Sequence, residues 1–188
     1  RLETNIGKFS TSLATVGFEL IKKHDFNINE TTFLIIGTGN MANLVNTVLD
    51  RTHIKKLYVA SHDMSRAKEM AEEWNGEAVD MENMHSALSE ANVIIGGTQG
   101  EINLLHEETM AESKCPRANF ALQSGGHKLF IDFGVPRNFT PSLKNDPNIS
   151  LYDLDDIKKI TYDGLLKRYD EIPQAKKLVN VELDRFMI

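Results

Sequence analysis

The residues with the clearest chemical meaning are the six from Gly37 to Ala42, which read Gly-Thr-Gly-Asn-Met-Ala. Gly37 permits a tight turn, and Gly39 leaves no Cβ atom in the way of an approaching pyrophosphate group. Ala42 is small enough for a helix to pack closely on the strand that precedes the turn. The amino end of that helix would offer unpaired N–H groups and a positive dipole to phosphates. The pattern is typical of a dinucleotide-binding turn.

The segments on both sides of this turn have the character that such a site requires. Residues 32–36 form an almost wholly apolar run, as expected for a strand that is covered on both faces. After the turn, apolar residues recur at helical spacing at Met41, Leu44, Val45, Val48 and Leu49. A buried strand, a glycine turn and an amphipathic helix in this order predict a bound dinucleotide.

The end of the second predicted strand, residues 57–60, bears on the choice between NAD and NADP. A carboxylate there binds a ribose 2′-hydroxyl, whereas an arginine accommodates a 2′-phosphate. Ser61 leaves room for a phosphate, His62 could donate to it, and Arg66 could reach back from the next helical turn. Asp63 would repel a phosphate unless it caps the following helix, which its position favours. These residues leave the choice open.

Strands and helices alternate along most of the chain. We predict strands at residues 32–36, 57–60, 78–79, 93–95, 129–132 and 149–152, with helices at 13–24, 41–49, 67–74 and 81–88 between or before them. This alternation predicts an α/β fold with a Rossmann-like, doubly wound parallel sheet, a flanking N-terminal helix and a long C-terminal helix. The expected parts are a leading helix and linker at 1–29, a nucleotide-binding domain at 30–154 and part of a long helix at 155–188.

The last of these parts carries a second periodicity. Leu165, Ile172, Val179 and Phe186 recur every seven residues, with Tyr169 and Leu183 between them. This spacing predicts a long helix that meets a partner along one seam, as in a coiled coil. Pro173 is expected to kink that helix, because proline removes a backbone hydrogen bond and clashes with the preceding turn.

Composition narrows the class of protein. The 188 residues carry a formal net charge of −6 and no stripe of lysine and arginine, which argues against a nucleic-acid interface in this chain. No apolar run approaches the roughly 20 residues of a membrane span, and no signal peptide opens the sequence. The single cysteine excludes an internal disulfide and fits a cytoplasmic protein. Because the sequence begins at Arg1 within apparently structured sequence, we expect it to be part of a longer chain.

Four segments, in order and correctly spaced, resemble the nucleotide-binding part of glutamyl-tRNA reductase. The first is Glu3-Thr4-Asn5-Ile6-Gly7-Lys8 with Ser12 and Glu19-Leu20, which is similar to the helix that leads into the family's nucleotide domain. The second is the turn Gly37–Ala42. The third and fourth, Asp132-Phe133-Gly134-Val135-Pro136-Arg137 and Leu151-Tyr152-Asp153-Leu154-Asp155-Asp156, are far more selective than the turn.

The resemblance implies a reaction in tetrapyrrole (porphyrin) biosynthesis. A cysteine attacks the glutamyl ester of charged tRNA, and NADPH reduces the resulting thioester to glutamate-1-semialdehyde. It implies a homodimer of the full-length protein, with tRNA bound by a catalytic domain that precedes Arg1. The expected NADP contacts are Gly37, Thr38, Gly39, Asn40, Met41 and Ala42 in the turn, with Ser61, His62, Arg66 and Thr98.

Three features differ from that family. Ser61-His62-Asp63 stands where the family has Asn-Arg-Thr, so the arginine expected on the 2′-phosphate is missing and the preference for NADPH is weakened. The nucleophile's Ser-x-Cys-Asn-Arg motif is absent, and Cys115 is interpreted as an incidental loop thiol. We therefore expect no reductase activity from this chain alone. The long helix is expected to be interrupted at Pro173 and ends at Ile188, short of the family's dimerisation region.

Two other functions remain open. A stand-alone dehydrogenase of the shikimate or sirohaem-precursor type would share this sheet, although no Lys/Asp pair is placed for its acid–base chemistry. A non-catalytic regulatory domain is mildly favoured by His62 in place of the arginine.

Several other polar residues have structural interpretations. Asp132 either faces the nicotinamide or stabilises a turn, and Arg137 is interpreted as a clamp on a neighbouring loop. Asp153, Asp155 and Asp156 are more simply helix caps than a cation site. The six histidines are too scattered to bind a metal.

Overall fold

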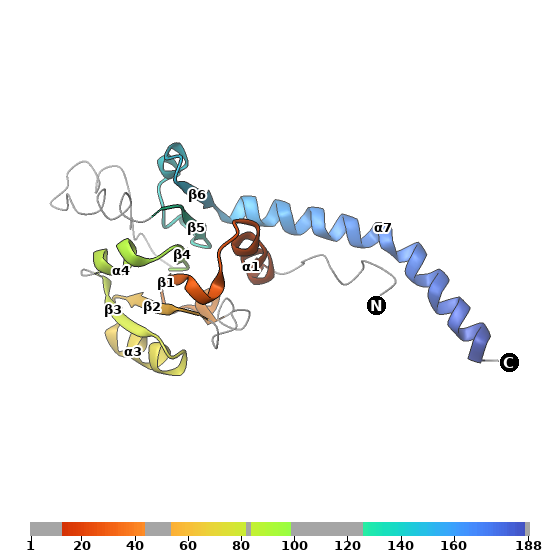
Figure 1. The fold of residues 1–188 in the computed structure, drawn as a ribbon, viewed down its shortest axis with the longest axis horizontal. Coiled ribbons are helices and arrows are strands. Elements are labelled where there is room, and N and C mark those ends of the chain that lie inside the picture. Colours follow the sequence, from red (N-terminus) through yellow and green to blue (C-terminus); the bar gives the residue numbers. More distant parts are fainter. Residues whose placement is uncertain (1–12, 44–53, 82–83, 99–125, 187–188) are drawn as a thin grey trace.

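The computed structural model of the chain describes residues 13–43, 54–81, 84–98 and 126–186. Its centre is a six-stranded parallel sheet in the order β3-β2-β1-β4-β5-β6 (Figure 1). The strands are β1 (Thr32–Ile36), β2 (Lys56–Ser61), β3 (Glu77–Asp80), β4 (Val93–Gly96), β5 (Lys128–Asp132) and β6 (Ile149–Tyr152). The strand order reverses between β1 and β4, where loops in such sheets diverge and leave a crevice for a ligand. The predicted Rossmann-like sheet is confirmed.

Both faces of the sheet are covered, which explains why its central strands are almost wholly apolar. In β1, Phe33 and Ile35 face one layer, whereas Leu34 and Ile36 face the other, and all four side chains are buried. The first layer contains α1 (Leu13–Lys23), α3 (Met64–Glu73) and the start of α7 (Leu154–Phe186). The second contains α4 (His85–Glu90) and the 3₁₀ helix η4 (Pro141–Asn145), while another 3₁₀ helix, η1 (Ile28–Glu30), leads into β1.

One predicted helix is misplaced. The helix expected at residues 81–88 is α4, which begins only at His85 and continues to Glu90. Met81 and Met84 precede it but are buried in the same apolar layer as Ala87 and Leu88, so their spacing imitates a helical stripe. The predicted segments at residues 3–8 and 44–49, and Cys115, lie outside the described residues.

The long helix α7 is continuous across Pro173, so the predicted interruption is wrong. The helix extends well beyond the sheet and bends part-way along its length (Figure 1). A bend is what a proline within a helix leads one to expect. The first turns of α7 pack beside α1 through the fully buried Ile157. Farther along, the predicted seam is open to solvent, with Tyr169 65% and Phe186 94% exposed. No helix in the described part of the chain is long and apolar enough to cross a membrane.

A buried cation joins α4 to β5. Lys128, which is 1% exposed, directs its Nζ at the carbonyl oxygens of Leu88, Ser89 and Ala91, at 3.1, 2.9 and 2.6 Å. Burial lowers the pKa of Lys128. The three carbonyls belong to the end of a short helix, where partial negative charge accumulates and a cation is stabilising. Lys128, the first residue of β5, therefore caps the carboxyl end of α4 with its side chain.

A second titratable cluster lies where α1, β5 and β6 meet. The His24 and His127 rings stack with their centroids 5.4 Å apart, and His24 Nε2 lies 3.2 Å from the Tyr152 hydroxyl. The pKa of His24 is lowered by burial, and by the nearby His127 and Lys23, while Asp25 acts in the opposite direction. The folded protein therefore resists protonation of this ring.

We predict that the free energy of unfolding decreases as the pH falls below 6.5, the ordinary pKa of histidine. The unfolded chain takes up the proton in that range, whereas folded His24 binds it only at lower pH, so acid favours unfolding. Urea midpoints at about pH 7.5 and about pH 5.5 measure the effect. His24→Gln should reduce the difference, and His62→Gln, at an exposed position, should not. An undiminished difference in His24→Gln would contradict the prediction.

Candidate nucleotide-binding site

The glycine turn begins directly after β1. Gly37 has a φ of +104°, and its N–H donates to the carbonyl of Ala60 at 2.8 Å. A Cβ atom there would lie 2.9 Å from Thr98 Cγ2 and 3.1 Å from the Gly97 backbone. Both the backbone conformation and the space therefore require glycine. Helical backbone follows from Asn40.

Gly39 differs from Gly37, because among the described residues a Cβ atom there would meet only the Gly97 carbonyl oxygen, at an ordinary 3.5 Å. The described part of the chain thus has room for a side chain at Gly39. The absence of one leaves the backbone open toward the cavity.

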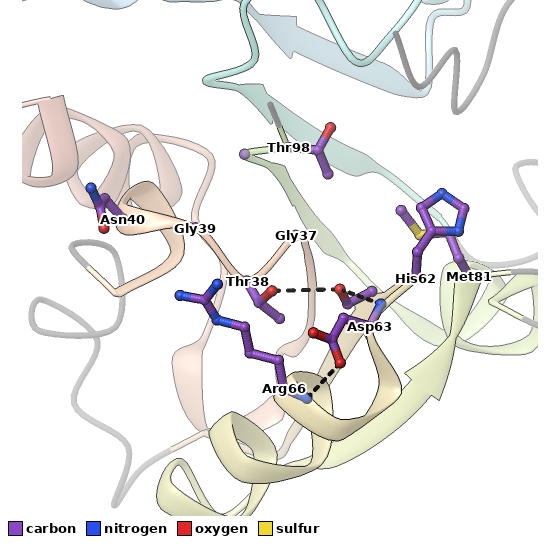
Figure 2. A pocket seen from close by; sticks show the side chains of 11 residues that line it. Gly37, Thr38, Gly39, Asn40, His62, Asp63, Arg66, Met81 and Thr98 are labelled. Carbon is purple, nitrogen blue, oxygen red and sulfur yellow. Dashed lines mark hydrogen bonds between the residues drawn. The ribbon is translucent and has the colours of Figure 1, made fainter. Parts of the chain in front are cut away.

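Two neighbouring cavities lie at the carboxyl ends of the strands. The first, of about 390 Å³, is lined by Gly37, Thr38, Gly39, Asn40, Ser61, His62, Asp63, Arg66, Met81, Gly97 and Thr98 (Figure 2). The second, of about 300 Å³, is lined by Gly39, Asn40, Met41, Gly97, Thr98, Phe133 and Val135. The four shared residues come from the loops after β1 and β4, so the cavities meet where the strand order reverses. This is the place at which open α/β sheets bind ligands.

The structure brings the predicted site residues together. Eight line the first cavity, namely Gly37, Thr38, Gly39, Asn40, Ser61, His62, Arg66 and Thr98. Met41 lines the second, and Ala42 is buried beneath the turn in the apolar core. Four further lining residues were not predicted, namely Met81, Gly97, Phe133 and Val135. Phe133 and Val135 could have been found, because they lie within the selective segment Asp132–Arg137.

Asp63, just after the end of β2, forms hydrogen bonds on both sides. Its carboxylate accepts the N–H of Arg66 at 3.1 Å, and its own N–H donates to Ser61 Oγ at 3.2 Å. The prediction that Asp63 caps the following helix is therefore confirmed. Figure 2 shows the Arg66 side chain extending from α3 toward the glycine turn, with His62 and Met81 on the other side of the cavity.

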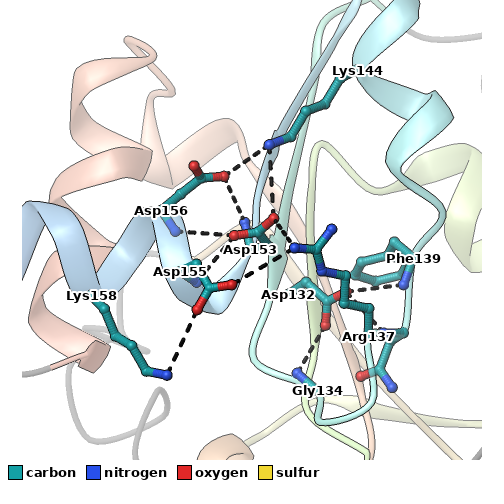
Figure 3. A network of polar contacts seen from close by, with 10 residues as sticks. Asp132, Gly134, Arg137, Phe139, Lys144, Asp153, Asp155, Asp156 and Lys158 are labelled. Carbon is teal, nitrogen blue, oxygen red and sulfur yellow. Dashed lines mark hydrogen bonds and ion pairs between the residues drawn. The ribbon is translucent and has the colours of Figure 1, made fainter.

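Asp132 stabilises the loop after β5. It is 1% exposed, and its carboxylate accepts backbone N–H groups from Gly134 at 2.8 Å, Asn138 at 2.9 Å and Phe139 at 3.0 Å (Figure 3). Burial raises the pKa of Asp132, although these three hydrogen bonds act in the opposite direction. Of the two roles expected for this residue, the structure supports turn stabilisation.

The same loop is tied to the start of α7. Arg137 lies 3.1 Å from an oxygen of Asp153 and 3.8 Å from one of Asp155, as expected for a clamp between loops (Figure 3). The other oxygen of Asp153 accepts the N–H groups of Asp155 and Asp156, at 3.1 and 3.0 Å. Asp153 therefore caps the helix, as predicted. Within the described ranges, no cluster of three or more histidine, cysteine, aspartate or glutamate residues could hold a metal ion.

Comparison with known proteins places these features in a family. The family described as shikimate / quinate 5-dehydrogenase matches residues 19–160, which include the glycine turn and the lining of both cavities. The chain belongs to this family.

The chain is also similar to glutamyl-tRNA reductases along nearly its whole length. It is 31% identical to that of Lawsonia intracellularis, over 99% of this chain and 42% of the relative. The structure of glutamyl-tRNA reductase from Methanopyrus kandleri superposes with a TM-score of 0.82 at 25% identity, over 98% of this chain and 45% of that chain. The nucleotide-binding domain of the Thermoplasma volcanium reductase gives a TM-score of 0.63 at 22% identity, over 85% of this chain and 98% of that chain.

The resemblance drawn from the four segments is therefore confirmed. This chain spans less than half the length of the two full reductases above.

We predict that Gly37→Ala lowers the free energy of unfolding by about 2–4 kcal/mol, since it combines a strained backbone with an overlap against Thr98. Gly17→Ala in α1 is the control. A Cβ atom there would meet Phe133 Cζ at 3.4 Å, and the free energy should stay within about 1 kcal/mol of the unmodified protein. Urea unfolding of both variants is the measurement, and equal stability of the two would contradict the account of the turn.

Proposed function

We propose that this chain is the nucleotide-binding part of a glutamyl-tRNA reductase and that it binds NADPH. The observation that carries the proposal is the likeness to glutamyl-tRNA reductases over 99% of the chain, together with a glycine turn that borders both cavities. The nucleotide would lie across the sheet, with its pyrophosphate at the amino end of the helix that begins at Asn40.

The lining of the two cavities suggests where each half of the nucleotide binds. The first cavity contains Ser61, His62 and Arg66 at the end of β2, and suits the adenosine half. His62 and Arg66 would supply the positive charge for a 2′-phosphate, since the Asp63 carboxylate already accepts a hydrogen bond as a helix cap. The second cavity has apolar walls at Met41, Phe133 and Val135, and suits the nicotinamide half. Thr98 would contact both halves from the loop after β4.

The residues of this chain would orient and shield the nucleotide rather than attack the substrate. When bound, NADPH would supply the hydride that reduces a glutamyl thioester to glutamate-1-semialdehyde. The thioester would form on a cysteine outside this chain, from glutamyl-tRNA held by a separate catalytic domain. We infer that the chain by itself has no reductase activity.

The remaining parts of the chain would serve assembly. We propose the division into a leading helix and linker at 1–29, the nucleotide domain at 30–154 and part of a long helix at 155–188. The exposed seam of α7, which includes Leu165, Val179 and Leu183, would meet a second copy in a full-length homodimer. A single cysteine fits the reducing cytoplasm, which is the proposed location.

Titration with NADPH tests the cofactor proposal, and Gly39→Ala sharpens the test. Since the fold has room for a Cβ atom at Gly39 but a pyrophosphate would meet it, this variant should weaken NADPH binding at least about tenfold. Its melting temperature should stay close to that of the unmodified chain. Fluorescence of bound NADPH gives the Kd, and thermal unfolding gives the control. The absence of saturable binding to the unmodified chain would refute the proposal.

The charge near the adenosine ribose makes a separate prediction. His62→Arg should raise the affinity for NADPH relative to NADH by about tenfold, because a guanidinium pairs with a phosphate through two hydrogen bonds. His62→Gln serves as the uncharged comparison and should not favour NADPH. The ratio of the two dissociation constants is the measurement, and an unchanged ratio in His62→Arg would remove His62 from the 2′-phosphate site.

A further inference from the structure

Asn138 is fully buried in the loop after β5 and lines neither cavity. Its Oδ1 accepts the backbone N–H of Thr98 at 3.1 Å, and its Nδ2 donates to Thr98 Oγ1 at 2.6 Å. A backbone N–H can only donate, so the orientation of the carboxamide follows from the chemistry. One side chain therefore holds both the main chain and the hydroxyl of Thr98, from a position 40 residues away.

Two glycines make room for this carboxamide. A Cβ atom on Gly134 would lie 2.6 Å from Asn138 Oδ1 and 2.7 Å from Nδ2. A Cβ atom on Gly96 would lie 3.0 Å from the same Oδ1. On the main-chain side, the N–H of Asn138 donates to the Asp132 carboxylate at 2.9 Å. The carboxamide is thus confined on several sides and has a single position in which to meet Thr98.

Thr98 in turn limits the glycine turn. Its methyl carbon would lie only 2.9 Å from a Cβ atom on Gly37, and Thr98 lines both cavities. Hydrogen bonds therefore run from Asp132 through Asn138 to Thr98, and the Thr98 methyl group occupies the space beside Gly37. If Asn138 is lost, Thr98 keeps no side-chain partner among the described residues, and the wall between the two cavities is free to shift.

We propose that Asn138 is a positioning residue for nucleotide binding, which fixes Thr98 as the common wall of the two cavities. The proposal rests on the proposed function, because the ligand is taken to be a nicotinamide nucleotide that spans both cavities. Asn138 acts through Thr98 and does not touch the ligand. A well-ordered wall would bind more tightly because less freedom is lost when the ligand arrives.

The test compares Asn138→Ala, Thr98→Val and the double variant in the 188-residue chain, with NADPH as the probe. We expect each single variant to weaken binding about tenfold, a size typical of coupling between residues in contact. The double variant should bind within about threefold of Asn138→Ala, because both substitutions disturb the same wall. Multiplication of the two single effects, to about a hundredfold, would overturn the proposal.

Asn92→Ala is the matched control. Asn92 Oδ1 accepts the N–H of Thr32 at 3.0 Å, at the amino ends of the strands and remote from both cavities. This variant should lose thermal stability, as Asn138→Ala does, yet keep its affinity for NADPH. Equal NADPH affinities of Asn138→Ala and Asn92→Ala would overturn the positioning role. If Asn138→Ala does not fold, Thr98→Val is compared with Asn92→Ala instead, since it removes the hydroxyl that Asn138 holds.

Amide hydrogen exchange of the nucleotide-free protein gives a readout that does not depend on the ligand. The Thr98 amide should be protected in the unmodified chain and in Asn92→Ala, and should exchange rapidly in Asn138→Ala. An unprotected Thr98 amide in the unmodified chain would overturn the inference even if NADPH binds. Failure of the unmodified chain to bind NADPH, with Thr98 protected, would instead refute the proposed function and with it the role of Asn138 in nucleotide binding.

Discussion

The loops that follow β1 and β4 approach each other until a Cβ atom at Gly37 would lie 3.1 Å from the Gly97 backbone. The sheet's hydrogen bonds continue into these loops, since Gly37 donates to Ala60 and Gly97 donates to Ile36, at 2.8 and 2.9 Å. Phe133 likewise donates to Gly96 at 2.8 Å. The loops that line the cavities therefore all begin at the carboxyl ends of strands that are hydrogen-bonded to one another. Without this close approach, the two cavities would not share a wall.

The strands and the turns at their carboxyl ends could largely be predicted from local sequence. A parallel strand covered on both faces is a continuous apolar run. Each predicted strand begins and ends within one residue of the observed strand. The glycine turn and the Asp63 cap are also local, because each needs only a few consecutive residues. The residues at the carboxyl ends of β1 and β2 could also be assigned to one site, because neighbouring parallel strands end at the same side of the sheet.

Contacts between residues far apart in the sequence could not be predicted in this way. Lys128 resembles an ordinary surface lysine until the end of α4 is folded against it, and only then do three carbonyls surround its Nζ. The sequence around Asn138 does not reveal its hydrogen bond to Thr98, because the two residues come together only when β4 and β5 pair. Met81 and Met84 misled the assignment of α4 because burial beside a helix produces the same spacing as burial within one.

Arg137 and Asn138 are consecutive residues with opposite roles. The first pairs with Asp153 and Asp155 at the start of α7, while the second holds Thr98 inside the domain. The 33-residue helix α7 is therefore held by Arg137, which is the residue next to the Asn138 that holds Thr98. The first turn of α7 is thus joined, through Arg137 and the next residue along the chain, to the side chain that holds Thr98 beside both cavities.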